Sequence, residues 1–180
     1  MRAFVALEIP GWYADEVAAF ARELSFHVDG RFTPRENYHV TLAFLGNATE
    51  GAVRGVMDVL DDLAYRHQAA ALAPDRLGKF GRRADSTLWL GFHRNEALDD
   101  LARDLRDQLE WRGIDFDRKA FLPHLTLARR VNLDSATALP EAGFPGRCRA
   151  YQLTLFKSQL APEGATYQPL YSVELPDLPR

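Results

Sequence analysis

The chain has 180 residues, of which 47% are apolar and 26% charged, a composition that suits one globular domain with a substantial core. A net charge of −3 excludes a general attraction to nucleic acid, and the single cysteine, Cys148, excludes an intramolecular disulfide and a cysteine-rich metal site. The first apolar stretch is interrupted by Glu8 and is too short for a signal peptide or a membrane span, which predicts a soluble cytoplasmic protein.

In the first half of the chain, strands are expected to alternate with helices. Residues 2–10 predict an opening strand, and residues 38–46 a second one. Apolar residues at helical spacing predict a helix after each strand, residues 30–37 predict a loop, and Thr49 is placed to cap the second helix. The two apolar stripes are Trp12, Val17, Phe20, Ala21 and Leu24, and then Val53, Val56, Met57, Leu60 and Leu63.

The second half repeats this alternation and ends in a hairpin. Residues 73–85 predict the edge of a strand and a basic turn at 78–83. A third helix, ending near Gly113, is expected from an apolar stripe formed by Leu98, Leu101, Leu105 and Leu109. Further strands are expected at 86–92, 121–129, 151–160 and 167–176, the last two joined by a turn.

Each half contains a strand, a helix and then a strand with a His-x-Thr motif. The motif histidines, His39 and His124, lie 85 residues apart, and no linker or low-complexity segment separates the halves. We therefore predict a single α+β domain over residues 1–180. It is bilobal, a unit duplicated about a pseudo-twofold axis, with antiparallel sheets lining a central cleft and helices outside.

The paired motifs are the candidate catalytic site. Side chains two apart on a strand share a face, so His39 lies with Thr41 and His124 with Thr126, and symmetric lobes would bring all four into one cleft. A lone histidine on a strand is usually structural. Chance, however, places Thr two residues after each of two of the five histidines in only about 2% of sequences of this composition. The remaining histidines, His27, His67 and His93, have no such context.

Two imidazoles and two hydroxyls suit hydrolysis of a phosphodiester, above all a strained cyclic one. One imidazole can act as general base while the other acts as general acid, and hydroxyls can donate to phosphate oxygens. A zinc site would need a third and fourth ligand, and neither motif supplies one. A serine nucleophile is disfavoured because the chain has no G-x-S-x-G, and Cys148 lies in no recognisable motif. We therefore expect no metal and no cofactor.

Four stretches together resemble the 2H phosphoesterases, and within them the RNA 2′,3′-cyclic phosphodiesterases, also called 2′–5′ RNA ligases. They are MRAFVALEIP, PRENYHVTLAFLGN, FLPHLTLAR and LTLFKSQLAPEGATYQPLYSVELP. The resemblance implies a bilobal α+β fold and metal-independent hydrolysis of RNA 2′,3′-cyclic phosphate ends to 2′-phosphates. It also implies ligation of such ends to 5′-hydroxyl ends without ATP.

The resemblance further implies a role for each motif residue. His39 would be the general acid that protonates the departing ribose 3′ oxygen, and His124 the general base that activates water. Thr41 and Thr126 would hold the phosphate oxygens, and Arg129 would neutralise phosphate charge.

Further residues are expected to bind substrate. Phe44 matches a base-stacking position, but strict alternation turns it away from His39, which leaves a core phenylalanine as the alternative. Alternation likewise favours Arg130 for the cleft, whereas the family offset selects Arg129, which we follow. Ser158 matches a family position, as a structural or cleft-edge hydroxyl. The 78–83 turn would be a solvated hairpin tip or a contact for single-stranded RNA.

Two rival functions stay open from the sequence alone. The cleft could bind a nucleotide or an RNA end without turnover, or the enzyme could act on another cyclic phosphate or on a 2′–5′ linked oligonucleotide. In our preferred interpretation the partner is an RNA end with a 2′,3′-cyclic phosphate, tRNA-derived ends among them, and the protein is a monomer without a membrane partner.

Overall fold

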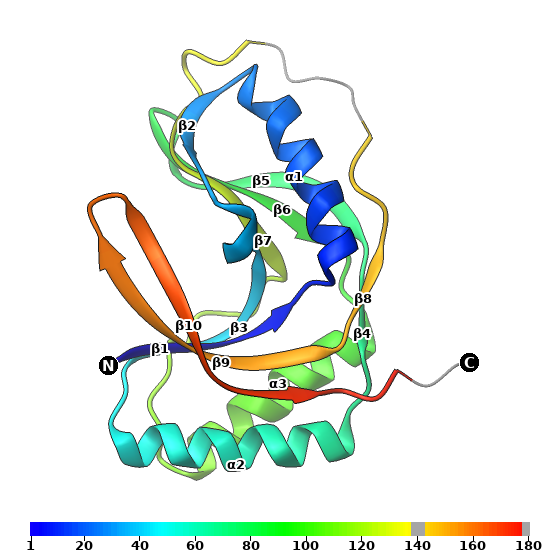
Figure 1. Ribbon diagram of the computed structural model, residues 1–180, viewed down its shortest axis with the longest axis vertical. Helices are drawn as coiled ribbons and strands as arrows, with labels where there is room; N and C mark the ends of the chain where they lie inside the picture. The colour runs from blue at the N-terminus through cyan, green and yellow to red at the C-terminus, as the bar shows by residue number, and fades with distance from the viewer. Residues whose placement is uncertain (138–142, 178–180) are drawn as a thin grey trace.

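Two four-stranded antiparallel sheets make up most of the computed structural model, which describes residues 1–137 and 143–177 (Figure 1). Their strands confirm the predicted α+β class. In chain order the elements are β1 Arg2–Glu8, α1 Gly11–Ser25, β2 Asp29–Phe32, the 3-10 turn Arg35–Asn37, β3 His39–Asn47, α2 Glu50–Arg66, β4 Ala70–Leu72, β5 Pro74–Arg82, β6 Asp85–Phe92, α3 Glu96–Trp111, β7 His124–Asn132, β8 Cys148–Ala150, β9 Gln152–Ala161 and β10 Gly164–Glu174.

The strand order reveals two related lobes. The first lobe is built on the sheet β10-β9-β1-β3, and the second on the sheet β2-β7-β6-β5. In each, a strand is followed by a helix and then by an antiparallel neighbour that carries a His-x-Thr motif: β1, α1 and β3 in the first half of the chain, and β6, α3 and β7 in the second. In this correspondence β9 matches β5, whereas β10 and β2 each lie beyond the shared core of three strands. A third, two-stranded sheet pairs β4 with β8.

Helices cover the sheets from outside. Figure 1 shows α2 and α3 packed together beneath the first lobe, and α1 alongside the second. The Thr49 hydroxyl accepts a hydrogen bond from the Ala52 backbone N–H at 3.1 Å, which confirms the predicted cap of α2. Within α1 the predicted stripe is wrong at Trp12, which is 56% exposed, because its neighbour Tyr13 turns into the core instead.

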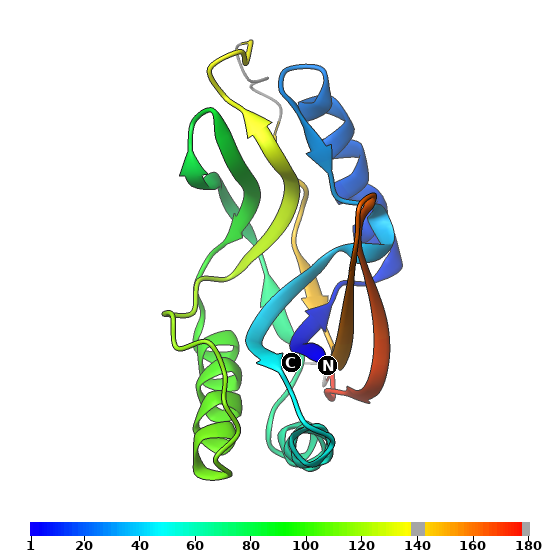
Figure 2. The same cartoon turned by 90° about the vertical axis from the view of Figure 1, so that its left-hand side faces the viewer.

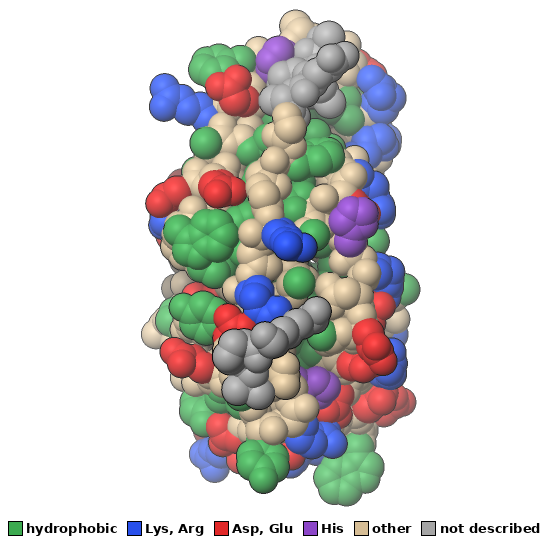
Figure 3. Space-filling view, turned by 90° about the vertical axis from the view of Figure 1, so that its right-hand side faces the viewer, with side chains coloured by type: hydrophobic (Ala, Val, Ile, Leu, Met, Phe, Trp, Pro, Cys, Tyr) green, Lys and Arg blue, Asp and Glu red, His purple; other side chains and the backbone are tan. Residues whose placement is uncertain are grey.

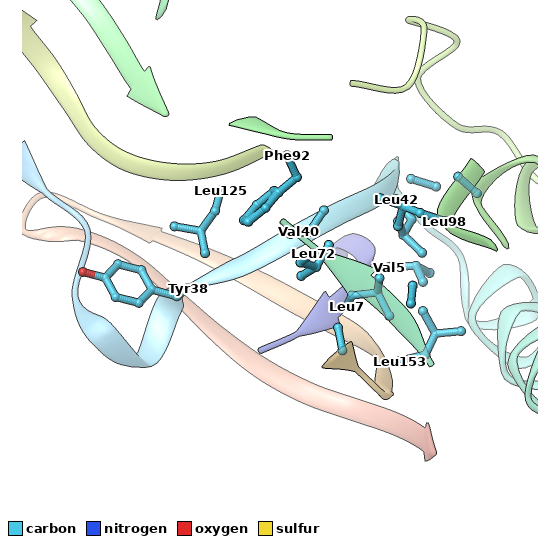
Figure 4. Packing of buried hydrophobic residues seen from close by; sticks show 14 of the residues in the cluster. Val5, Leu7, Tyr38, Val40, Leu42, Leu72, Phe92, Leu98, Leu125 and Leu153 are labelled. Carbon is cyan, nitrogen blue, oxygen red and sulfur yellow. The ribbon is translucent and has the colours of Figure 1, made fainter. Parts of the chain in front are cut away.

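The apolar faces of the motif strands form part of the core, as the alternation predicts. Val40 and Leu42 of β3 and Leu125 of β7 are fully buried in one apolar cluster, and Figure 4 shows Leu42 beside Leu98 of α3. This packing fixes the rotation of both strands, so the opposite faces of the motifs are held toward the space between the lobes.

Two predicted loops are partly strands. Residues 30–37 contribute β2, because Arg31 and Phe32 find partners on β7, and only the remainder forms a turn. The basic segment 78–83 is strand through Arg82, because β5 pairs with β6 along this length, and only Arg83 and Ala84 form the turn. Local composition marked both segments as turns, but pairing across the sheet determined their conformation.

The face on the right of Figure 1 carries no large area of one charge. Figure 3 shows acidic, basic and apolar side chains interspersed over it, as the small net charge of −3 would suggest. Among residues 1–137 and 143–177, no helix has the length and hydropathy that a membrane span requires.

Candidate active site

The two motif strands meet at a single cleft between the lobes. Strands β3 and β7 lie next to one another across the side of the molecule seen in Figure 2. The cleft has a volume of about 910 Å³. Its walls include all four motif side chains, His39, Thr41, His124 and Thr126. The predicted convergence of the two motifs is therefore what the fold produces.

Each motif strand contains a β-bulge at the same place. On β3, Thr41 faces Ala6 of β1 and Ala43 faces the next residue, Val5, so one residue of β3 is extra. On β7, Thr126 faces Trp89 of β6 and Ala128 faces the preceding residue, Leu88, so again one residue is extra. A bulge shifts the side chains that follow it, up to the next irregularity, to the opposite face of the strand.

The bulges bring the fifth residue after each histidine into the cleft. Phe44, which is 50% exposed, and Arg129 both line the cleft, although unbroken alternation would turn both away. Arg130 has a positive φ of 55° and forms an ion pair with Asp85 at 3.0 Å, outside the cleft lining. The parity argument for Arg130 is therefore wrong, because it assumed a regular strand. Ser158, on β9, also lines the cleft.

Hydrogen bonds fix the tautomer of both imidazoles. Nδ1 of His39 lies 2.7 Å from the Asn37 carbonyl oxygen, and Nδ1 of His124 lies 2.6 Å from that of Leu122. A carbonyl oxygen only accepts, so each Nδ1 must carry the proton. In the neutral ring Nε2 is then an acceptor, and on His39 it receives a hydrogen bond from the Thr41 hydroxyl at 2.9 Å.

Burial favours the neutral form of both imidazoles. Desolvation lowers the pKa of His39 to about 4, with smaller contributions from the charges of His124 and Arg129. Desolvation also lowers the pKa of His124, and the Arg129 charge adds to this effect. Arg129 thus influences both histidines, which places its guanidinium within electrostatic reach of the two motifs.

Aromatic rings surround both histidines, and only Phe80 lies in a segment, 78–83, that the sequence marked as a contact for RNA or a solvated turn. Ring centroids lie 4.9 Å from His39 to Phe4 and 5.3 Å from His39 to Tyr167. On the other lobe, the ring of His124 lies 5.2 Å from Phe80 and 5.6 Å from Trp89. Phe4 and Trp89 lie on β1 and β6, which pair with the motif strands, whereas Tyr167 and Phe80 lie on the more distant strands β10 and β5 of the same sheets.

The segment between α3 and β7 forms the rim of the cleft beside β3. The Asp117 backbone N–H donates to the Phe44 carbonyl at 2.8 Å. Arg106 of α3 donates to the carbonyls of Leu42 at 3.1 Å and Lys119 at 2.7 Å. These contacts hold the rim against the bulged part of β3. Arg106, Asp117 and Lys119 all line the cleft and were not predicted.

The other histidines lie outside this cleft. His67 contacts Asp104 at 2.6 Å between α2 and α3, and His27 contacts Thr137 at 3.1 Å. Over the described ranges, 1–137 and 143–177, no three His, Cys, Asp or Glu side chains gather as potential metal ligands.

Known proteins share both this sequence pattern and this fold. The chain is 31% identical over 129 residues to the RNA 2′,3′-cyclic phosphodiesterase of Geobacillus stearothermophilus, a match over 71% of this chain and 41% of that relative. It is 27% identical over 177 residues to the protein of the same name from Methanocaldococcus jannaschii, covering 93% and 97% of the two chains.

Solved structures of similar proteins share the fold of this chain. The structure of Escherichia coli LigT complexed with 3′-AMP superposes with a TM-score of 0.77 at 28% identity, over 97% of each chain. A Thermus thermophilus structure shares the fold with a TM-score of 0.83 at 24% identity, over 97% of this chain and 98% of that one. Residues 13–161 match the 2′-5′ RNA ligase superfamily, and the chain belongs to that family.

Proposed function

We propose that the protein hydrolyses RNA 2′,3′-cyclic phosphate ends to 2′-phosphates by metal-independent acid–base catalysis. The observation that carries this proposal is a pair of imidazoles that line one cleft, each with Nδ1 fixed by a backbone carbonyl and Nε2 available for proton transfer. The names of the relatives, RNA 2′,3′-cyclic phosphodiesterases, support the substrate class.

The chemistry assigns one proton transfer to each lobe. Neutral His124 accepts a proton from water through Nε2, and the resulting hydroxide attacks phosphorus. His39, when protonated at Nε2, donates to the ribose 3′ oxygen as the P–O3′ bond breaks, which leaves the phosphate on the 2′ oxygen. Arg129 neutralises the phosphate, and Thr41 and Thr126 donate hydrogen bonds to its non-bridging oxygens.

Substrate binding supplies the missing proton to His39. Its pKa of about 4 keeps the ring neutral at pH 7 until a charge nearby changes that pKa. An anionic phosphodiester nearby favours the imidazolium and raises that pKa. Once Nε2 carries a proton it can no longer accept from Thr41, at present 2.9 Å away. The Thr41 hydroxyl is then free to donate to the phosphate, so protonation and phosphate binding reinforce each other.

The remaining cleft residues complete the substrate site. Phe44 offers an exposed ring on which the terminal base stacks, and Ser158 supplies a hydroxyl at the cleft edge. Ligation of the same ends to 5′-hydroxyl RNA, without ATP, uses the same two proton transfers. We further propose that the protein acts as a cytoplasmic monomer, that tRNA-derived ends are among its substrates, and that it needs no cofactor.

Product analysis tests this function directly. An oligoribonucleotide ending in a 2′,3′-cyclic phosphate is incubated with the protein in EDTA, and the 2′- and 3′-phosphate products are separated. We expect the 2′-phosphate at an undiminished rate. A requirement for a divalent ion would refute the acid–base mechanism, and tight binding without turnover would show a binding module instead. Hydrolysis restricted to other cyclic phosphates or to 2′–5′ linked oligonucleotides would reassign the substrate.

A further inference from the structure

In the proposed reaction the leaving group and the nucleophile lie on opposite sides of the phosphorus atom. In an in-line displacement the nucleophile enters opposite the leaving oxygen. If His39 protonates the leaving O3′, the ribose of the cyclic phosphate lies toward the first lobe. The nucleophile then approaches from the second lobe, beside His124. What this surface can hold decides which nucleophiles the enzyme accepts.

The surface beside His124 is an open aromatic platform. Phe80 of β5 stands edge-on to His124, with ring centroids 5.2 Å apart and an interplanar angle of 88°. Its ring also lies 5.2 Å from that of Trp89, which supports it from β6. Phe80 lines the cleft and is 44% exposed. One part of this ring is therefore available to a ligand.

The corresponding place in the first lobe is closed. Phe156 of β9 faces Phe4, just as Phe80 of β5 faces Thr87. Phe156 is only 9% exposed, and Tyr167 from β10 packs against it with centroids 6.4 Å apart. Among the residues that the structure describes, no strand of the second lobe is equivalent to β10, and β5 is the edge of its sheet. The two lobes therefore differ at equivalent positions. The aromatic ring of the second lobe is exposed on the side where the nucleophile enters, whereas that of the first lobe is buried.

Water needs no aromatic platform, whereas a nucleoside does. We propose that Phe80 stacks the first base of a second RNA strand and presents its 5′-hydroxyl to His124, so that Phe80 defines an acceptor site for ligation. This inference rests on the proposed function, because it uses the same assignment of acid and base.

The transfer step balances without a co-reactant. The acceptor 5′ oxygen forms a bond to phosphorus while the P–O3′ bond breaks. The 5′-hydroxyl proton goes to Nε2 of His124, and His39 gives its proton to O3′. The products are a 2′–5′ phosphodiester and a free 3′-hydroxyl. The two histidines return to their starting states by exchange with solvent.

The charge on β5 fits an RNA acceptor. Lys79 and Arg82 lie within two residues of Phe80 on β5, and both are exposed. Within the part of the chain that the structure describes, neither Arg82 nor Lys79 forms an ion pair with a carboxylate. Both cations can therefore attract the phosphates that follow the first acceptor nucleotide.

Competition between nucleophiles tests the acceptor site. A donor oligonucleotide with a 2′,3′-cyclic phosphate is incubated with adenosine, or with methanol, and the transfer product is measured against the 2′-phosphate formed in the same tube. We expect Phe80→Ala to lower the ratio of adenosine transfer to hydrolysis by about five- to hundredfold, the usual effect of losing one stacked base. The methanol ratio should stay unchanged, because methanol has no base to stack, and Phe80→Trp should retain the adenosine ratio.

Two comparisons separate binding from positioning. Phe44→Ala acts on the donor, which both reactions share, so its adenosine ratio should match that of the wild type. If Phe80→Ala leaves the adenosine ratio unchanged, or lowers the methanol ratio equally, Phe80 only positions His124 and the acceptor site is refuted. Hydrolysis by the wild type without any adenosine transfer would also refute it, while leaving the proposed function intact. Absence of hydrolysis would refute the proposed function itself.

Discussion

Replacing Arg129 by Met should change how activity depends on pH, as well as lowering it. The Arg129 charge contributes, after burial, to the low pKa of both His39 and His124. Its removal should therefore raise both values. In a profile of kcat/KM, which reports the free enzyme, both limbs of the bell should move toward higher pH.

The size of the effect follows from the protonation of the acid. With the pKa of His39 at about 4, only about one molecule in a thousand carries the acid proton at pH 7, a cost of about 4 kcal/mol. The wild type already bears this cost, and in the variant the loss of the guanidinium on the phosphate costs about 1.5–3 kcal/mol, or about 10- to 150-fold in kcat/KM. On the alkaline limb the raised pKa of His39 offsets part of this loss. On the acid limb the raised pKa of His124 adds to it.

The assay is kcat/KM for an oligonucleotide with a cyclic phosphate end, measured from pH 3 to 9 so that the acid limb is covered. The deficit of Arg129→Met should be larger on the acid limb than on the alkaline limb. Arg130→Met is the matched control, since this neighbouring arginine is paired with Asp85 outside the cleft, and its profile should follow the wild type. A deficit that is constant with pH would show that Arg129 acts on phosphate alone.

Three further outcomes are expected. His39→Ala and His124→Ala should each lower turnover by about a hundredfold or more, and a leaving group that departs unprotonated should rescue only His39→Ala; rescue of the other variant would reverse the two roles. Gly78→Ala would place a Cβ 2.2 Å from the Trp89 ring, so urea unfolding should show a loss of about 1–3 kcal/mol, and an unchanged midpoint would contradict this packing. Burial raises the pKa of Asp104, but hydrogen bonds and charges between α2 and α3 lower it more, so its net pKa lies below 3.8. Asp104→Asn should cost about 1–3 kcal/mol at pH 7, and this difference should shrink as the pH falls below 3.8, whereas a gap that persists at pH 2 would contradict the linkage.

The sequence predicted those features that repeat with a regular period. The strands 38–46 and 121–129, the stripes of α2 and α3 and the closing hairpin are all confirmed, because alternation and helical spacing record which face is buried. The resemblance to the 2H phosphoesterases is confirmed by the family match. The convergence of the two His-x-Thr motifs was also predictable, since duplicated halves bring equivalent strands together.

The sequence could not predict where a β-bulge interrupts the alternation of a strand. Nor could it predict which distant strands come into contact. A bulge leaves no residue signature in HVTLAF or HLTLAR, so the directions of Phe44 and Arg129 could not be settled by counting. The strand β2 and the length of β5 depend on partners far along the chain. The platform of Phe80 depends on which strand lies at the edge of a sheet, and sheet order is not written in any one segment.

The rim beside β3 also covers part of the edge of a sheet. The strand order leaves β3 at the edge of its sheet, where unpaired backbone groups could accept a strand from another molecule and begin aggregation. Arg106 and the Asp117 backbone N–H already occupy the carbonyls of Leu42 and Phe44 on this side. β3 can therefore present one face to the cleft while these two carbonyls at its edge are unavailable to a strand from a neighbouring chain.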